Sequence, residues 1–184
     1  MRAVFLDRDG TVNKEVDNLR SLGQLRILPG VAPAIRELNK LGFLVIVITN
    51  QPVVSRGLVT EKEVDAIHAV LVRRLGQKGA KLDAVYYCPH HPMAQVRKYR
   101  VVCRCRKPNT GLIIKATKKF GINLKKSFMV GDSTRDVLAG KNANMKTILV
   151  KTGYAGKDGK YNVKPDFTAK NLNEAVKIIK RNAR

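Results

Sequence analysis

The sequence has few aromatic residues and no long apolar run. Aromatic side chains make up 5% of its 184 residues, and tryptophan is absent. Binders of single-stranded nucleic acid use interleaved aromatic side chains for base stacking, so this scarcity argues against such a role. No apolar run approaches the roughly 20 residues that cross a bilayer. The chain starts directly in an apolar strand, which leaves no room for a signal peptide. We therefore expect a cytoplasmic protein without a membrane segment.

Acidic residues are scarce relative to basic ones. The chain has 36 Lys and Arg against 14 Asp and Glu, a formal charge of +22, and no acidic residue lies between Asp83 and Asp132. A field of this sign attracts polyanions such as phosphorylated substrates and nucleic acid. Lysines such as Lys118 and Lys119 can equally be the solvated face of a helix. The charge alone therefore does not decide what the protein binds.

Cysteine is also scarce, and its placement is uneven. The chain has three cysteines, an odd number that does not suit the disulfide framework of a secreted domain. All three fall within one segment that also contains histidine. Three thiolates and one imidazole form the closed tetrahedral ligand set of a structural Zn²⁺ site. The sequence therefore predicts zinc bound by Cys88, His90, Cys103 and Cys105. Reduced cysteines that merely pack within a loop are the alternative.

Strands alternate with helices along the chain. Apolar patterning predicts strands over residues 3–6, 44–48, 84–87, 127–130 and 147–150. It predicts helices over residues 31–41, 60–78, 111–120, 135–143 and 172–179. This alternation is typical of an α/β fold with a doubly wound parallel sheet. The length and the 44% hydrophobic content fit a single domain, residues 1–184, with the predicted zinc loop inserted at about 88–108.

Two carboxylates follow the first predicted strand, in the motif Phe5-Leu6-Asp7-Arg8-Asp9-Gly10-Thr11. Like charges so close together are costly unless they share a cation or a proton. Their position at the carboxyl end of a strand is where α/β proteins bind ligands. The motif indicates a divalent metal site in which one carboxylate is a nucleophile and the other carries a proton. A plain acidic turn after the strand is the alternative.

Three further elements should meet Asp7 at the same edge of the sheet. Thr49 ends a buried strand, and its hydroxyl can bind a phosphoryl oxygen. Lys107 supplies a cation that could neutralise charge on a transferred group. Asp132 follows another strand and adds a carboxylate. Mg²⁺ prefers oxygen ligands, and a fitting set is Asp7, Asp132 and the backbone carbonyl of Asp9.

In order and spacing, these elements resemble the haloacid dehalogenase superfamily of aspartate-nucleophile phosphatases. The resemblance implies a Rossmann-like fold in which Asp7 attacks phosphorus and Asp9 is the general acid and base. It also implies that Thr49 and Lys107 hold the phosphoryl group and that Asp132 completes the Mg²⁺ site. The intervals before and after Thr49 contain no insertion large enough for a cap domain. We therefore expect an open active site.

The zinc loop followed by Arg106-Lys107-Pro108 resembles one branch of that superfamily. This branch contains the D-glycero-D-manno-heptose 1,7-bisphosphate 7-phosphatases and the histidinol-phosphate phosphatases, and the heptose enzymes are the better match. The resemblance implies a phosphorylated sugar as substrate and gives Arg106 the task of recognising its second phosphate. The implied substrate-binding residues are Arg8, Glu15, Asp17, Asn18, Asn50, Gln51, Arg106 and Ser133.

Other functions are open at this stage. Histidinol phosphate is the alternative small substrate. A nucleic-acid 3′-phosphatase would suit the positive charge but is disfavoured by the few aromatic residues. A non-catalytic, zinc-stabilised binding protein would not need the acidic motif. The sequence has no heptad seam for self-association, so we expect a monomer.

Overall fold

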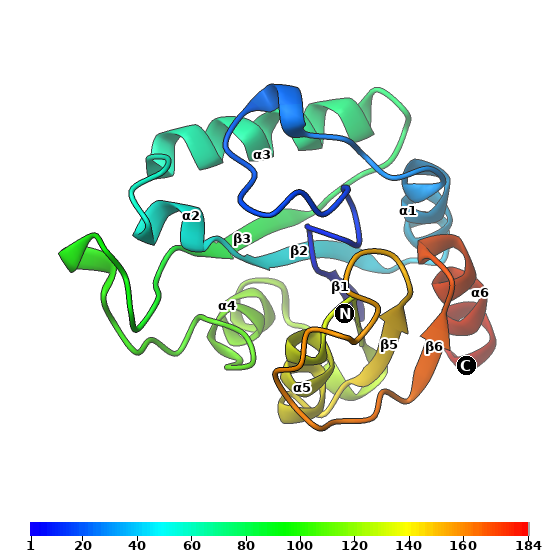
Figure 1. The fold of residues 1–184 in the computed structure, drawn as a ribbon. Coiled ribbons are helices and arrows are strands. Elements are labelled where there is room, and N and C mark those ends of the chain that lie inside the picture. The colour runs from blue at the N-terminus through cyan, green and yellow to red at the C-terminus, as the bar shows by residue number, and fades with distance from the viewer. Residues whose placement is uncertain (184) are drawn as a thin grey trace.

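The computed structural model describes residues 1–183, in which six parallel strands form one sheet (Figure 1). The strands are β1 (Ala3–Leu6), β2 (Leu44–Asn50), β3 (Ala84–Cys88), β4 (Phe128–Gly131), β5 (Lys146–Val150) and β6 (Phe167–Ala169). Their order across the sheet is β3-β2-β1-β4-β5-β6. β1 pairs with β2 on one side and with β4 on the other. The strand order therefore reverses beside β1, and such a switch point leaves a crevice for ligands at the carboxyl ends of the strands.

Helices cover both faces of this sheet (Figure 1). One face packs against α1 (Val31–Lys40), α3 (Glu61–Gly76) and α6 (Leu172–Asn182). The other packs against α4 (Gly111–Phe120) and α5 (Thr134–Asn142). Alternate residues of β1 enter the two cores, as the period of a strand requires. All four residues of β1 are buried, as expected for a central parallel strand.

The predicted α/β fold with a doubly wound parallel sheet is confirmed, and its elements begin and end close to the predicted residues. The helix predicted from residue 60 begins with a capping box. The backbone N–H of Thr60 donates to Oε2 of Glu63 over 2.7 Å, and the N–H of Glu63 donates to Oγ1 of Thr60 over 3.2 Å. The short 3₁₀ helices are η1 (Leu22–Gln24), η2 (Arg97–Tyr99) and η3 (Leu124–Lys126).

Two short elements differ from the expectation. Strand β6 was not predicted, because three residues at the sheet edge give too little alternation to recognise. Helix α2 (Pro52–Ser55) follows β2 where no helix was expected. Pro52 occupies its first turn, where the missing backbone N–H leaves no helical hydrogen bond unmade. Among the helices formed by residues 1–183, none is long and apolar enough to cross a bilayer.

Candidate active site and zinc site

Three carboxylates meet at the carboxyl ends of β1 and β4. Asp7 follows β1, Asp132 follows β4, and Asp136 lies in the first turn of α5. One oxygen of each lies within 4.8 Å of the others. Burial and then the Asp136 charge raise the pKa of Asp7 to about 7. Burial and then the Asp7 charge raise the pKa of Asp132 to about 8. Such a cluster of oxygen ligands fits a hard divalent cation, Mg²⁺ in particular.

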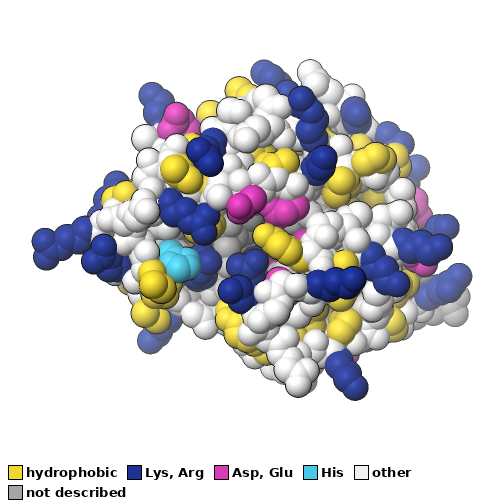
Figure 2. Space-filling model, in the orientation of Figure 1, with side chains coloured by type: hydrophobic (Ala, Val, Ile, Leu, Met, Phe, Trp, Pro, Cys, Tyr) yellow, Lys and Arg dark blue, Asp and Glu magenta, His cyan; other side chains and the backbone are white. Residues whose placement is uncertain are grey.

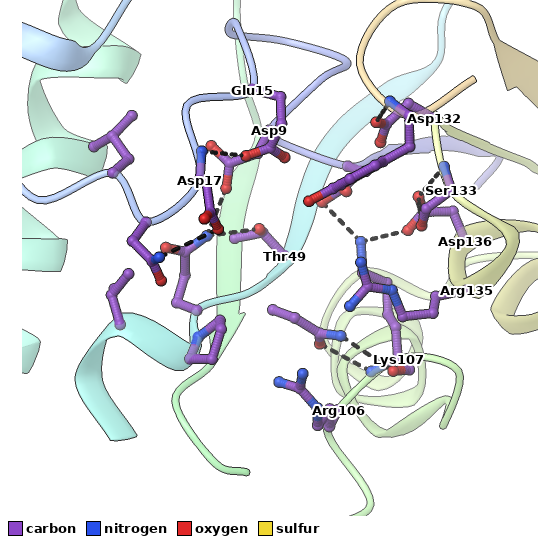
Figure 3. Close-up of a pocket in the computed structure, with 18 of the residues that line it drawn as sticks. Asp9, Glu15, Asp17, Thr49, Arg106, Lys107, Asp132, Ser133, Arg135 and Asp136 are labelled. Carbon is purple, nitrogen blue, oxygen red and sulfur yellow. Dashed lines mark hydrogen bonds and ion pairs between the residues drawn. The ribbon is translucent and has the colours of Figure 1, made fainter. Parts of the chain in front are cut away.

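Lys107 lies between two of these carboxylates (Figure 3). Its Nζ is 2.8 Å from Oδ1 of Asp7 and 2.6 Å from Oδ1 of Asp136, and it donates to the carbonyl of Ile48 over 2.9 Å. The Lys107 side chain is only 3% exposed. Burial alone would lower the pKa of Lys107, but the charges of Asp136 and Asp7 outweigh it and raise the pKa. The ammonium group is therefore held charged beside the predicted nucleophile.

The other oxygen of Asp136 caps the helix that carries it. Its Oδ2 accepts from Oγ of Ser133 over 2.7 Å and from the Ser133 backbone N–H over 3.1 Å. Both oxygens of Asp136 are therefore occupied within the protein, one by Ser133 and one by Lys107. Asp136 was not among the predicted site residues. Its spacing of three from Ser133 is a capping-box pattern, but that pattern does not indicate contact with a lysine from another element.

Two glycines close the space around Asp132. A Cβ on Gly10 would lie 2.3 Å from Oδ2 of Asp132, and a Cβ on Gly153 would lie 2.1 Å from the same atom. Both glycines have positive φ, +75° for Gly10 and +66° for Gly153. The backbone N–H of Tyr154 also donates to Oδ2 of Asp132 over 2.7 Å. The loop after β5 therefore positions Asp132 as well as lining the site.

Asp9 is held by a set of donors separate from that of Asp7. Arg8 donates from Nε and Nη2 to Oδ1 of Asp9 over 3.0 and 2.8 Å, and from Nη2 to Oδ2 over 2.7 Å. Nδ2 of Asn13 donates to Oδ1 and Nε2 of Gln51 donates to Oδ2, each over 2.9 Å. Burial alone would raise the pKa of Asp9, but the Arg8 charge and these hydrogen bonds lower it. In this arrangement Asp9 is a carboxylate.

These groups line a cleft of about 240 Å³ with two differently charged sides. Figure 2 shows Asp and Glu side chains gathered near the centre of the molecule, with Lys and Arg side chains around them. The acidic side includes Asp9, Glu15 and Asp17, and the opposite side carries basic groups (Figure 3). The basic lining residues are Arg56, Arg106, Lys107, Arg135 and Lys160. Such a cleft suits a ligand that carries both hydroxyl groups and phosphate.

The predicted zinc ligands lie together beside β3. Sγ of Cys88 lies 3.3 Å from that of Cys103 and 2.9 Å from that of Cys105, and Nδ1 of His90 lies 3.4 Å from Sγ of Cys105. All four ligand atoms lie within 4.8 Å of one another. The interaction with Cys88 lowers the pKa of the Cys105 thiol to about 5, although burial opposes the shift. Three sulfurs and one imidazole gathered in this way form a ligand set that suits Zn²⁺.

Known proteins share this sequence and fold. Residues 104–175 match a family model described as HAD-hydrolase-like. The D-glycero-beta-D-manno-heptose-1,7-bisphosphate 7-phosphatase of Escherichia coli (strain K12) is 40% identical over 82% of this chain and 80% of its own length. The protein of that name from Pasteurella multocida is 36% identical over 97% of each chain. This chain belongs to the haloacid dehalogenase superfamily.

A solved structure agrees with this assignment. The D,D-heptose 1,7-bisphosphate phosphatase of B. bronchiseptica, crystallised with magnesium and phosphate, has a TM-score of 0.87 and is 31% identical, and the match covers 100% of both chains. The chain is therefore a phosphatase, a hydrolase of phosphoric monoesters. The sequence had indicated this superfamily from the acidic motif and the zinc loop, and that prediction is confirmed.

The predicted substrate-binding residues differ in where they lie relative to the cleft. Glu15, Asp17, Asn18 and Arg106 line the cleft. The side chains of Asn50, Gln51 and Ser133 also reach it, but each is already hydrogen-bonded within the protein: Asn50 to the backbone of Lys107, Gln51 to Asp9 and Thr49, and Ser133 to Asp136. These partners come from distant segments, so the sequence did not reveal them.

Arg8 differs most from its predicted role. It is 1% exposed and is not among the residues that line the cleft. Its guanidinium points into the protein, where Asp9, Gln51 and His68 satisfy it. A buried arginine must keep such partners, because leaving its charge unpaired away from water is very costly. Direct substrate binding by Arg8 is therefore not supported by its position.

The raised carboxyl pKa values predict how Mg²⁺ stabilisation of the phosphatase depends on pH. The pKa values of Asp7 and Asp132, about 7 and about 8, lie above the unfolded value of 3.8. Between the unfolded and the folded pKa values, the metal-free folded state therefore binds more protons than the unfolded state. The stability of the metal-free protein should therefore fall as pH rises through this window. Mg²⁺ needs both groups deprotonated, so its stabilising effect should grow over the same range.

The measurement is the shift in melting temperature on adding saturating Mg²⁺ to zinc-loaded protein, taken at about pH 6 and about pH 8. We expect the larger shift at the higher pH. The Asp132→Asn variant is the control, since it removes one of the two titrating ligands and should weaken the pH dependence. A wild-type shift that is equal or larger at the lower pH would contradict the assignment of these carboxylates to Mg²⁺.

Proposed function

We propose that this phosphatase removes the 7-phosphate of D-glycero-D-manno-heptose 1,7-bisphosphate in an Mg²⁺-dependent reaction. The observation that carries the proposal is the cleft itself. Lys107 and Asp7 lie together within it, and Arg56, Arg106 and Arg135 are among its lining residues. The names of the relatives support this substrate and favour its β anomer. Three unbridged cysteines support a cytoplasmic location, and we propose that the protein acts there as a monomer.

In the proposed reaction, an oxygen of Asp7 attacks phosphorus and the bond to the sugar oxygen breaks. Asp9 gives a proton to the departing oxygen, so the sugar leaves as an alcohol. Asp9 then takes a proton from water, whose oxygen attacks the aspartyl-phosphate and releases phosphate from Asp7. Because Arg8 and Gln51 donate to the oxygens of Asp9, its protonation requires one of these contacts to be given up.

Asp7, Asp132 and the backbone carbonyl of Asp9 would hold Mg²⁺. When bound, the ion keeps Asp7 deprotonated and neutralises charge on the phosphoryl oxygens. Lys107 adds a second positive charge and orients Asp7 through their 2.8 Å contact. The Thr49 hydroxyl lies beside the same site but already accepts a hydrogen bond from Nε2 of Gln51 over 2.9 Å. It can still donate to a phosphoryl oxygen, since a hydroxyl donates and accepts at once.

The arginines on the basic side support a substrate with a second phosphate. Burial and then the Arg135 charge lower the pKa of Arg106, so these guanidinium groups repel one another in the absence of an anion. Nη1 of Arg106 donates to the carbonyl of His90 over 3.2 Å, which ties it to the zinc loop. A phosphate placed among these groups would relieve the repulsion and accept paired hydrogen bonds.

The test is phosphate release from four compounds: each anomer of the heptose bisphosphate, histidinol phosphate, and an oligonucleotide with a 3′-phosphate. We expect kcat/KM for one anomer, the β form by resemblance, to exceed the values for the last two by at least about tenfold, a difference of about 1.4 kcal/mol. Preference for histidinol phosphate or the oligonucleotide would refute the proposed substrate while retaining the phosphatase chemistry.

The Arg106→Ala variant adds a second comparison. It should reduce kcat/KM for the bisphosphate by about 10- to 100-fold, because a charge-assisted contact of about 1.5–3 kcal/mol is lost. It should reduce kcat/KM for a monophosphate much less. The control is Arg36→Ala, an exposed arginine of α1 that does not line the cleft. Equal losses on both classes of substrate would show that Arg106 does not bind the second phosphate.

A further inference from the structure

A buried histidine lies behind the predicted proton carrier and has no part in the mechanism above. His68 is 6% exposed and lies on the buried side of α3, near Val64, Ile67 and Leu71. Helical spacing alone would make it one more core position. Its Nε2, however, lies 3.0 Å from Nη1 of Arg8. This contact joins α3 to the loop after β1.

Chemistry fixes the protonation state of this histidine. Arginine only donates hydrogen bonds, so Nε2 of His68 must be the acceptor and the ring proton lies on Nδ1. Burial and then the Arg8 charge lower the pKa of His68 to about 3, so the ring is neutral at neutral pH. The ring of Tyr87 packs against it, with centroids 5.4 Å apart, and limits its movement.

Arg8 uses its remaining nitrogens on other buried groups. Nε and Nη2 hold both oxygens of Asp9, and Nη2 also donates to Oε1 of Gln51 over 3.0 Å. Nη1 alone faces His68. The guanidinium is planar and its donors are rigidly related, so an acceptor at Nη1 fixes the plane in which Nε and Nη2 meet Asp9. At 1% exposure for Arg8, little space remains for water to replace the histidine.

We propose that His68 is a positioning residue for Asp9, acting through Arg8 as a neutral hydrogen-bond acceptor. The inference rests on the proposed role of Asp9 as the general acid. Without the acceptor, the Arg8 guanidinium would turn toward another partner and the Asp9 carboxylate would lose its fixed orientation. Transfer of phosphate to Asp7 would then slow for a leaving oxygen that needs the proton, whereas Asp7 itself would stay in place as the nucleophile.

The leaving group of the substrate separates these two effects. A sugar leaves as a poorly stabilised alkoxide and needs the proton from Asp9. A p-nitrophenolate ion is stable without it. Because kcat/KM covers the steps up to transfer of phosphate to Asp7, it reports the acid role of Asp9. In His68→Leu we expect kcat/KM for the heptose bisphosphate to fall by about 10- to 100-fold, part of the usual contribution of a general acid. For p-nitrophenyl phosphate we expect less than about a threefold loss.

His68→Gln is the matched control. Its Oε1 can take the place of Nε2 as acceptor for Arg8, so kcat/KM for the sugar substrate should return to within about threefold of wild type. His68→Asn has the same chemistry on a shorter side chain that does not reach Arg8, and it should behave like His68→Leu. If the leucine variant fails to fold, the comparison of His68→Gln with His68→Asn still tests whether His68 acts as the acceptor for Arg8. Melting temperature and zinc content establish that each variant is folded.

Two results would overturn the inference. One is an equal loss on the sugar and aryl substrates, and the other is a glutamine variant no better than the asparagine variant. If the heptose bisphosphate is not the substrate, the wild-type enzyme will already fail to hydrolyse it, so that outcome is distinguishable from the effect of His68. In that case the comparison uses the alkyl phosphate that the wild type does hydrolyse, and the ratio of alkyl to aryl losses still tests His68.

Discussion

Asp7→Asn should abolish phosphate release while the protein stays folded. Turnover should fall by at least about 10⁴-fold, because the amide cannot form the acyl-phosphate on which both chemical steps depend. Lys107 would keep Asp136 and the carbonyl of Ile48 as partners, so the buried ammonium would not be left unpaired. The measurement is kcat for phosphate release at saturating Mg²⁺, alongside the melting temperature.

The stability of this variant provides an independent check. The Asp7 pKa of about 7 lies above its unfolded value of 3.8, so its ionised form destabilises the metal-free folded state once the pH exceeds this range. A neutral amide removes that cost, and the metal-free variant should melt no lower than wild type at about pH 8. Asp65→Asn, on the exposed side of α3, is the matched control and should retain activity. Near-wild-type turnover by Asp7→Asn would refute the nucleophile assignment.

Cys103→Ser should remove zinc and strongly destabilise the protein. Cys105 directly precedes Arg106 and Lys107, and Nδ2 of Asn109 donates to the carbonyl of Cys103 over 2.9 Å, so we expect the cluster to hold both cations in place. Loss of a structural metal is one of the changes that can lower the free energy of unfolding by more than about 4 kcal/mol. For a chain of this size that corresponds to a fall in melting temperature of roughly 8–16 °C.

Elemental analysis and thermal unfolding test this prediction together. Wild type should contain one zinc per chain, and Cys103→Ser should contain much less, with lower activity because Lys107 is displaced. His91→Ala is the control, since His91 neighbours the ligand His90 but lies outside the four-ligand cluster. It should retain its zinc. Full zinc occupancy in Cys103→Ser would exclude Cys103 as a ligand.

Local patterns in the sequence were sufficient to predict the fold and several of the residues that meet at the cleft, although not Asp136. The period of two in β1, the capping box at Thr60 and the apolar run of β2 are signals that neighbouring residues carry alone. They predicted a parallel α/β sheet, and parallel strands bring Asp7 and Asp132 to one edge. Cysteine spacing predicted the zinc cluster in the same way, because only a few residue types make good zinc ligands.

The tertiary structure decided what each side chain contacts. Lys107 could have faced the substrate alone, yet it lies between Asp7 and Asp136, which come from two different elements. Arg8 follows the nucleophile in sequence but turns inward to Asp9 and His68. The orientation of a long charged side chain depends on which partners can satisfy it when it is buried, and those partners are brought there by folding.

The sequence by itself thus determined the superfamily and the sheet, and it predicted two clusters of residues that could hold metals, since each depends on residue type and spacing. Only the tertiary structure showed that glycines at positions 10 and 153 close around Asp132 and that arginines from separate segments share one side of the cleft. It also placed His68 behind Asp9. These features depend on distances of a few ångströms between segments far apart in the chain, which no local pattern encodes.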